Sequence, residues 1–454
     1  MKRKIYDKLL EWKRSSNGAT ALLIDGARRV GKSYVAEEFA QREYGSRLII
    51  DFSIANPRIK RIFNDYLGDL DTFFLYLQRI TGSRLVPGDG LVVFDEVQKF
   101  PRAREAIKHL VKDGRFHYIE TGSLISINKN VKDILIPSEE RRVPMYPMDF
   151  EEFLWALGDN ATFPLIENRF ATLQPVGQPF HGQIMDMFRQ YMIVGGMPQA
   201  VAEFASSRDL GRVDAVKRDI LALYRGDIMK YGGVLKHKAA SVFNAIPSQL
   251  SRHEKRLSLS HIRAGAKMRD FESTFDWLEA SMMVNVCRRA SEPNVGLELT
   301  TDRAALKCYL ADTGLLVSHA FGENELAAGK IHDRLLLNDI DINEGMIVEN
   351  VVAQMLRAAG HSLYFFSKTD RAKPADTMEI DFLVAKSKTN RMHNVSPIEV
   401  KSGRSYSTVS LERFRAKYGR FIDKAVVLHP KDFGTRGDVV LVPLYATPLL
   451  VSHT

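Results

Sequence analysis

The sequence contains only two cysteines, Cys287 and Cys308, among 454 residues. Two thiols cannot form a disulfide framework or a zinc site made of several cysteines, and this scarcity is typical of a reducing compartment. No apolar run approaches the roughly 18 residues that a membrane-spanning helix needs. Residues 1–6 (MKRKIY) also lack the apolar core of a signal peptide. We therefore expect a cytoplasmic protein without a membrane partner.

Acidic residues are fewer than basic ones: the sequence has 55 Asp and Glu and 64 Lys and Arg, which gives a net charge of +9. The remaining composition, 45% hydrophobic and 26% charged, is that of an ordinary folded protein and excludes extended disorder. At about 150 residues per domain, the length predicts two to four domains. The positive surplus favours an anionic partner such as a nucleotide, a nucleic acid or a membrane surface.

A phosphate-binding loop is predicted in the first third of the chain. Residues 21–25 form an apolar run typical of a buried strand, and residues 34–44 have a helical pattern. Between them, GARRVGKS fits the pattern G-x-x-x-x-G-K-[ST] without a mismatch. The backbone N–H groups of such a loop surround a phosphate at the N-terminus of the helix. The predicted nucleotide-binding residues are Gly26, Ala27, Arg28, Arg29, Val30, Gly31, Lys32, Ser33 and Tyr34.

Two carboxylates after a second apolar strand predict hydrolysis as well as binding. Residues 90–94 are apolar and are followed by Asp95 and Glu96. In such sites Lys32 reaches the β- and γ-phosphates, the Ser33 hydroxyl coordinates Mg²⁺, and Asp95 holds the ion through water. Glu96 is placed to polarise the attacking water. The cofactors expected here are therefore ATP and Mg²⁺.

Hydroxyl and guanidinium groups follow the next strand. A strand at 116–120 ends before Thr121 and Ser123, whose hydroxyls would lie beside the γ-phosphate in a sensor position; plain turn chemistry is the alternative. Further on, Arg141 and Arg142 either supply positive charge to the transition state or lie on the surface. The sequence assigns no arginine finger and no oligomeric state, so a homo-oligomer stays an open possibility.

The motifs at 22–33, 94–98 and 120–123 resemble those of a widespread family of bacterial and archaeal AAA-type ATPases. The stretch IPSEERRVPMYPMDFEEF at 136–153 is the most diagnostic part of this resemblance, and residues 191–198 and 306–316 also match the family's pattern. In that family the ATPase module is fused to a C-terminal domain of unknown function that looks nuclease-like. The resemblance implies a P-loop fold with an AAA-type parallel α/β sheet.

Positive charge is concentrated in residues 235–270, which contain eight basic residues and only two acidic ones, Glu254 and Asp270. The hydrophobic pattern predicts helices at 238–250, 259–264 and 267–282, and two short strands at 284–286 and 296–299 that could form a wing. This order resembles a winged helix that contacts DNA. The alternative is a helical adaptor whose basic face is solvated or contacts the ATPase module. The basic residues are Lys236, Lys238, Arg252, Lys255, Arg256, Arg263, Lys267 and Arg269.

The last third predicts the element order αβββαβ, which resembles the core of restriction-endonuclease-like folds. The elements are expected at 345–359, 362–366, 379–384, 396–401, 410–418 and 424–428. In such a fold Asp381 and Glu399, on adjacent strands, would hold one Mg²⁺, with Glu349 as a further ligand. Lys401 shares a face with Glu399 and would steady the attacking water. The alternative is a decayed nuclease fold that is kept as a scaffold or as a DNA clamp.

These observations predict three domains: an ATPase domain at 1–155, a helical, winged-helix-like region at 156–330, and a restriction-endonuclease-like domain at 331–454. The predicted function is an Mg²⁺-dependent ATPase that binds nucleic acid, DNA in the first place, with a metal-dependent nuclease site formed by Asp381, Glu399 and Lys401. The alternative function is an ATP-gated regulatory or protein-interaction module with an inactive nuclease-like domain.

Overall fold

The computed structural model separates the chain into two compact units. One comprises Met1–Tyr146 with Ala280–Met282, and the other comprises Pro147–Glu279 with Met283–Thr454. The structure describes residues 1–123, 138–252, 256–293, 296–321, 344–369, 376–385 and 395–450. Within these ranges, no helix is both long enough and apolar enough to cross a membrane.

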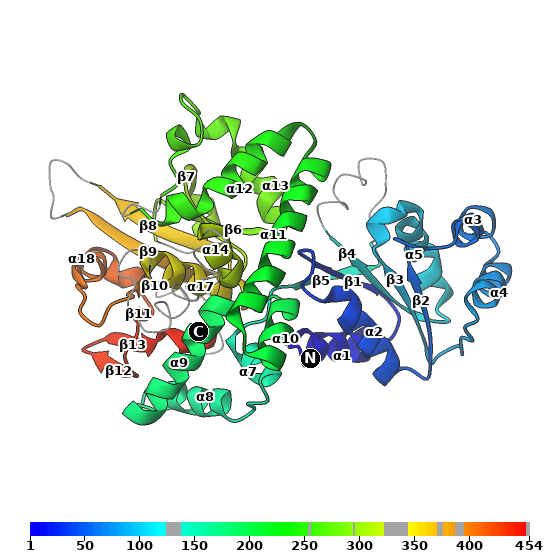
Figure 1. Cartoon of the computed structure of the whole chain (residues 1–454), viewed down its shortest axis with the longest axis horizontal. Coiled ribbons are helices and arrows are strands. Elements are labelled where there is room, and N and C mark those ends of the chain that lie inside the picture. Colours follow the sequence, from blue (N-terminus) through cyan, green and yellow to red (C-terminus); the bar gives the residue numbers. More distant parts are fainter. Residues whose placement is uncertain are drawn as a thin grey trace. The chain divides into compact units, whose positions relative to one another are not determined.

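The first unit contains a parallel five-stranded sheet with the strand order β2-β3-β4-β1-β5 (Figure 1). Its strands are β1 (Ala21–Gly26), β2 (Ser46–Asp51), β3 (Gly90–Asp95), β4 (His117–Gly122) and β5 (Glu140–Met145). Its helices are α1 (Ile5–Ser16), α2 (Lys32–Glu43), α3 (Pro57–Asp65), α4 (Leu70–Thr81) and α5 (Pro101–Asp113). This arrangement confirms the predicted parallel-sheet P-loop fold of the N-terminal third.

Burial on both faces explains why β1 and β3 are continuous apolar runs. Every residue of these two strands is buried, as is typical of parallel strands covered by helices. On one face a group of phenylalanine rings fills the space between the sheet and the helices. Phe63 of α3 contacts Phe73 of α4 and Phe94 of β3 in edge-to-face geometry, with ring centroids 5.0 and 5.6 Å away.

The second unit combines a helical layer with a mixed sheet. In the described residues the sheet has the order β12-β13-β11-β10-β9-β8-β6-β7 (Figure 1). Its strands are β6 (Val284–Ala290), β7 (Thr301–Leu310), β8 (Leu363–Lys368), β9 (Met378–Ala385), β10 (Val395–Val400), β11 (Ala425–His429), β12 (Gly434–Arg436) and β13 (Val439–Pro443). The helices include α7 (Phe150–Ala156), α8 (Thr162–Thr172), α9 (Gln178–Val194), α10 (Pro198–Ser207), α11 (Leu210–Tyr231), α12 (Lys236–Leu250), α13 (Glu272–Ala280), α14 (Thr313–Ala320), α17 (Glu344–Ala358) and α18 (Val409–Tyr418).

The C-terminal element order agrees with the prediction. Helix α17, strands β8, β9 and β10, helix α18 and strand β11 follow one another as expected. Strand β9 is antiparallel to both of its neighbours, β8 and β10, whereas β10 and β11 are parallel. Leu411 and Phe414 of α18 pack on the sheet in one core cluster with Ile380 and Val427. The predicted helix at 238–250 is also present, as α12.

The predicted wing differs from the structure in two ways. Residues 296–299 were expected to be a strand, but Leu297–Thr300 is a 3₁₀ helix that follows a left-handed Gly296 with φ of 78°. The expected helix at 267–282 is broken into a 3₁₀ turn, Met268–Asp270, and α13, and residues 259–264 form only a short 3₁₀ turn. The difference from the predicted wing arises from tertiary pairing, because β6 pairs with both β7 and β8 and is a strand inside a larger sheet.

The three-domain division stays a proposal. The boundary expected at 330/331 lies outside the described residues, and strands from both sides of it, β6 and β7 before and β8 to β13 after, belong to one sheet. Two charged residues of the basic segment at 235–270, Glu254 and Lys255, also lie outside the described residues.

Candidate functional site

The phosphate-binding loop connects β1 to α2 in the first unit. Strand β1 ends at Gly26, and α2 begins at Lys32. Gly31, the residue before the helix, has φ of 96°, and Arg29 has φ of 70°, so two left-handed residues turn the loop. A Cβ atom on Gly26 would lie 2.5 Å from the carbonyl oxygen of Met145, which explains why glycine is required there. A loop of this kind before a helix N-terminus is the arrangement in which backbone N–H groups bind a phosphate.

Lys32 lies inside the loop. Its side chain is buried, and Nζ donates hydrogen bonds to the carbonyl oxygens of Gly26, at 3.0 Å, and Ala27, at 2.9 Å. Burial lowers the pKa of Lys32 to about 8, and the carboxylates of Glu96, Asp95 and Asp25 oppose this shift. The loop carbonyl oxygens thus hold the Lys32 side chain in place.

A hydrogen-bonded group joins the loop to the ends of β3 and β4. The Ser33 hydroxyl donates to Asp95 Oδ1 at 2.7 Å, and the Thr121 hydroxyl donates to the same oxygen. The backbone N–H of Glu96 in turn donates to the Thr121 hydroxyl at 3.3 Å. These residues come from three separate parts of the chain and meet because parallel strands end at the same edge of the sheet.

This group fits Mg²⁺ together with a nucleotide. Hydroxyl and carboxylate oxygens are hard ligands, and Mg²⁺ is usually held by one or two carboxylates and the phosphates of its substrate. Ser33 and Asp95 would hold the ion; when bound, it would neutralise charge on the β- and γ-phosphates. Thr121 is fully buried within β4, so it lies in a strand and not in a turn. Ser123 is half-buried and follows the end of β4.

Glu96 has the backbone and the environment of a functional carboxylate. It directly follows β3 with φ of 56°, a conformation that costs energy in any residue other than glycine and is common at active sites. Burial raises the pKa of Glu96, while Lys32 and Arg28 oppose the shift. Its Oε2 accepts a hydrogen bond from Gln98 Nε2 at 2.5 Å. A raised pKa brings the carboxylate closer to the range in which it can accept a proton from water.

The other predicted loop residues divide into buried and exposed ones. Ala27 and Val30 are buried, whereas Arg28 and Tyr34 are exposed; the Tyr34 hydroxyl accepts a hydrogen bond from the Met1 amino group. Arg141 and Arg142 lie on β5, opposite Leu22 and Leu23 of β1. The Nε atom of Arg142 contacts Glu140 at 3.2 Å, and Arg141 is exposed. These positions assign neither arginine to the transition state.

Arg3 also supports the loop, although the sequence analysis did not identify it. Its side chain is 6% exposed, and Nη1 donates to the Val30 carbonyl at 2.8 Å. Nη2 donates to the Tyr146 carbonyl at 2.7 Å. Arg3 therefore connects the loop to the segment after β5. In the sequence it is one of several basic residues near the N-terminus, and no local pattern distinguishes it from the others.

The predicted nuclease residues lie in the second unit, where the structure separates them into two groups. Asp381 and Glu349 lie near Lys307, whose Nζ is 3.7 and 3.9 Å from their carboxylate oxygens. Glu399 instead accepts a hydrogen bond from Lys401 Nζ at 2.8 Å, as the shared face of these two residues predicted. Burial raises the pKa of Glu399, and Lys401 opposes this shift.

The two groups have different protein partners. Glu399 lies opposite Val427 in the parallel pair β10–β11, and Val427 belongs to the core beneath α18. Asp381 and Glu349 of α17 lie near Lys307. The Val400 N–H donates to Asp381 Oδ2 at 2.8 Å, so the Asp381 carboxylate also contacts the residue that follows Glu399. Across the described residues, no group of three or more His, Cys, Asp or Glu side chains is arranged to hold a metal ion.

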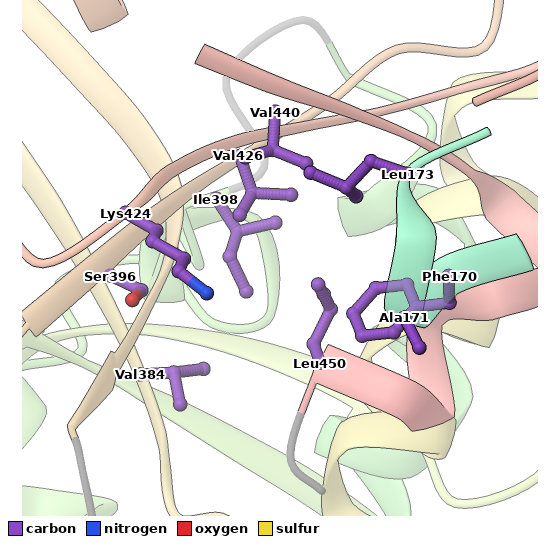
Figure 2. Close-up of a pocket in the computed structure, with 10 residues that line it drawn as sticks. All are labelled: Phe170, Ala171, Leu173, Val384, Ser396, Ile398, Lys424, Val426, Val440 and Leu450. Atoms are coloured by element: carbon purple, nitrogen blue, oxygen red, sulfur yellow. The ribbon is translucent and has the colours of Figure 1, made fainter. Parts of the chain in front are cut away.

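An apolar cavity of about 250 Å³ adjoins the same sheet. Figure 2 shows Val384, Ile398 and Val426 from β9, β10 and β11 on one side of it, and Phe170 and Leu173 on the other. The polar side chains in its lining are Ser396 and Lys424. The other described residues of the lining are apolar.

Three family models match separate parts of the chain. Residues 19–154 match the model described as an AAA domain. The first unit is an AAA-type P-loop module. Residues 185–326 and 344–447 match models that are both described as domains of unknown function, DUF8612 and DUF4143. None of the curated proteins compared with the chain matches it.

Solved structures show only distant likeness. A Walker-type ATPase of Pyrococcus abyssi is 14% identical, with a TM-score of 0.39 over 70% of this chain and 96% of that one. The Holliday junction branch migration motor RuvB of Thermotoga maritima is 12% identical, with a TM-score of 0.29 over 68% and 92%. AMPPCP-bound DnaA of Aquifex aeolicus is 12% identical, with a TM-score of 0.25 over 62% and 86%.

Proposed function

We propose that the first unit binds ATP with Mg²⁺ and hydrolyses it. The observation that carries this proposal is the convergence of Ser33, Asp95 and Thr121 in one hydrogen-bonded group beside the phosphate-binding loop. A loop that only bound an anion would need none of these contacts. Their position next to Glu96 supports hydrolysis as the reaction.

Each residue has a definite task in this proposal. The loop amides and Lys32 orient the β- and γ-phosphates, and Ser33 and Asp95 hold the metal ion. Glu96 accepts a proton from the water that attacks the γ-phosphate, and Gln98 keeps the Glu96 carboxylate in place. The products are ADP and inorganic phosphate.

Nucleotide binding is tested with Lys32→Ala and titration of a fluorescent ATP analogue. We expect at least a 100-fold loss of affinity, because the loss of a buried charge-assisted contact to phosphate costs about 3 kcal/mol. The matched control is Lys8→Ala, which removes an exposed lysine of α1. Unchanged affinity in the Lys32 variant would rule out this loop as the nucleotide site.

A nucleic-acid-binding role of the second unit is the second proposal. Four basic side chains in the 235–270 segment are exposed in the described residues: Arg256, Arg263, Lys267 and Arg269. Their clustering supports contact with a phosphate backbone, and the αβββαβ order supports the restriction-endonuclease-like interpretation. A winged-helix arrangement finds less support, because β6 and β7 are part of the large sheet.

Salt dependence tests this second proposal. Phosphate contacts predict that the DNA affinity of the full chain falls steeply as salt rises, with a slope that decreases by about one for each basic residue removed. The test variant is Arg263→Ala with Lys267→Ala, and the control is Lys60→Ala on α3 of the first unit. Absence of DNA binding at low salt would favour the alternative, an ATP-gated module that recognises a protein.

A further inference from the structure

A buried lysine lies at the centre of the acidic residues of the second unit. We call Lys307, Glu349, Glu379 and Asp381 the Lys307 cluster. The Lys307 Nζ atom is 2.9 Å from Glu379 Oε1, 3.7 Å from Asp381 Oδ1 and 3.9 Å from Glu349 Oε2. Its side chain is only 1% exposed, whereas that of Glu379 is 45% exposed, so the cluster opens to solvent on the Glu379 side.

The sheet explains how Lys307 reaches this position. In β7 it lies directly opposite Cys287 of β6, and β6 pairs in parallel with β8. Side chains that are paired in this way share a face, so Lys307 lies on the same face as Phe365 of β8. The ammonium is 5.2 Å from the centre of the Phe365 ring. The Lys307 side chain therefore extends over the face of the sheet to which it belongs, from β7 toward β9.

A bulge in β9 directs Asp381 to the same face. Tyr364 of β8 pairs with Leu383, but Phe366 pairs with Ile380, so two residues of β9, Asp381 and Phe382, lie opposite one residue of β8. Such a bulge alters the alternation of side chains along a strand. Tyr309, next but one to Lys307 in β7, contacts Phe382 with ring centroids 5.8 Å apart.

The carboxylates of the cluster already have protein partners. Glu349 Oε2 accepts a hydrogen bond from the Tyr309 hydroxyl at 2.9 Å, and Asp381 Oδ2 accepts one from the Val400 N–H at 2.8 Å. Burial alone lowers the pKa of Lys307, but Glu349, Asp381 and Glu379 outweigh it and raise the pKa above its ordinary value.

We propose that the Lys307 ammonium occupies the position that a divalent cation would take between Asp381 and Glu349, so that the second unit has no metal site there and does not cleave nucleic acid. The other expected ligand, Glu399, accepts a hydrogen bond from Lys401 Nζ at 2.8 Å. A second cation would have to approach within a few ångströms of a buried ammonium that is held by three carboxylates. This proposal does not depend on ATP hydrolysis by the first unit.

The test measures Mn²⁺ binding by the full chain without nucleotide, using electron paramagnetic resonance of free Mn²⁺. The variants are Asp381→Asn, Lys307→Met and the double variant. We expect the wild type and Asp381→Asn to bind the same amount of Mn²⁺, because Asp381 is not a metal ligand. Lys307→Met is expected to gain about one Mn²⁺ per chain, and the double variant to lose it again. Any Mn²⁺ held by the first unit is common to all four proteins.

Two results would overturn the proposal. The first is a Mn²⁺ site in the wild type that Asp381→Asn removes. The second is a folded Lys307→Met protein that gains no Mn²⁺, since the ammonium would then not be holding a cation position. If Lys307→Met does not fold, the comparison of wild type with Asp381→Asn decides alone. The same pair is incubated with plasmid DNA and Mn²⁺, and cleavage that depends on Asp381 would also overturn the proposal.

Discussion

Replacing Arg104 by Met should strongly destabilise the first unit. Arg104 of α5 is 2% exposed and makes two hydrogen bonds to the Glu140 carboxylate at the start of β5, both at 2.8 Å. Glu120 of β4 is fully buried beside them, and its pKa is raised by burial and by the Glu140 carboxylate. Without Arg104, the Glu140 charge would remain buried and largely uncompensated, with Arg142 as its remaining cationic partner.

The expected size of the effect follows from this burial. Removing one partner of a buried ion pair costs about 3–5 kcal/mol. For a unit of this size the loss corresponds to a decrease of roughly 10 °C in the midpoint of its thermal transition, measured by calorimetry on the full chain. The double variant Arg104→Met with Glu140→Gln removes the orphaned charge as well and should recover at least about 1 kcal/mol.

The pH dependence gives an independent check. Burial alone would raise the pKa of Glu140, but its hydrogen bonds and charge interaction with Arg104 lower it from 4.5. A lowered carboxylate pKa adds stability that is present above the unfolded value and is lost as the pH falls through the folded value. The difference between wild type and Arg104→Met should therefore be largest near about pH 7 and shrink below about pH 4. A change of less than about 2 °C, or a double variant no more stable than the single one, would refute this reasoning.

Two further predictions concern the phosphate-binding loop. Gly26→Ala should lower the thermal midpoint and weaken ATP binding at least 10-fold, because the added Cβ would lie 2.5 Å from the Met145 carbonyl oxygen and overpacking costs about 1–3 kcal/mol. Gly68→Ala is the control, since its Cβ would meet nothing within 4 Å; equal effects in the two variants would contradict the prediction. Lys32, with a pKa of about 8, should take up about half a proton when ATP binds at about pH 8, and almost none at about pH 6. Calorimetry in two buffers of different ionisation enthalpy measures this uptake, and equal uptake at both pH values would contradict it.

The loop could be predicted from the sequence because its determinants are local. The strand, the glycine pattern and the helix follow one another within residues 21–44, and β1 and α2 form as expected. Asp95, Glu96 and Thr121 could be predicted as well, because each follows or ends an apolar strand. The contacts among them, such as the hydrogen bond from Thr121 to Asp95, depend on the strand order β3-β4-β1 and are visible only in the fold.

Residues whose contacts lie far away in the sequence could not be identified from the sequence. Arg3 contacts carbonyl groups 27 and 143 residues away, so its role cannot be read from the basic residues around it. Lys307 appeared only within a stretch that resembles the family pattern, and its carboxylate partners lie beyond the expected boundary at residue 330. In both cases a single charged side chain is buried by elements that are distant in the sequence.

The C-terminal strands show how much of the arrangement of the predicted nuclease residues follows from the alternation of side chains. Simple alternation correctly placed Glu399 and Lys401 on one face, which their hydrogen bond confirms. The bulge in β9, which lies against β8, changes the alternation of side chains at Asp381, and no residue pattern in the sequence indicates this bulge. The Asp381 carboxylate is 3.7 Å from Lys307 Nζ, a contact between residues 74 positions apart that the strand pattern did not indicate.

The most direct test of the central claim is the rate of phosphate release from ATP in Mg²⁺ by wild type and Glu96→Gln. Loss of a general base predicts a decrease of about 10²–10⁴-fold in that rate, with ATP binding retained. Glu37→Gln, on the exposed side of α2, is the matched control and should hydrolyse ATP at the wild-type rate. Hydrolysis by Glu96→Gln at the wild-type rate would contradict the account.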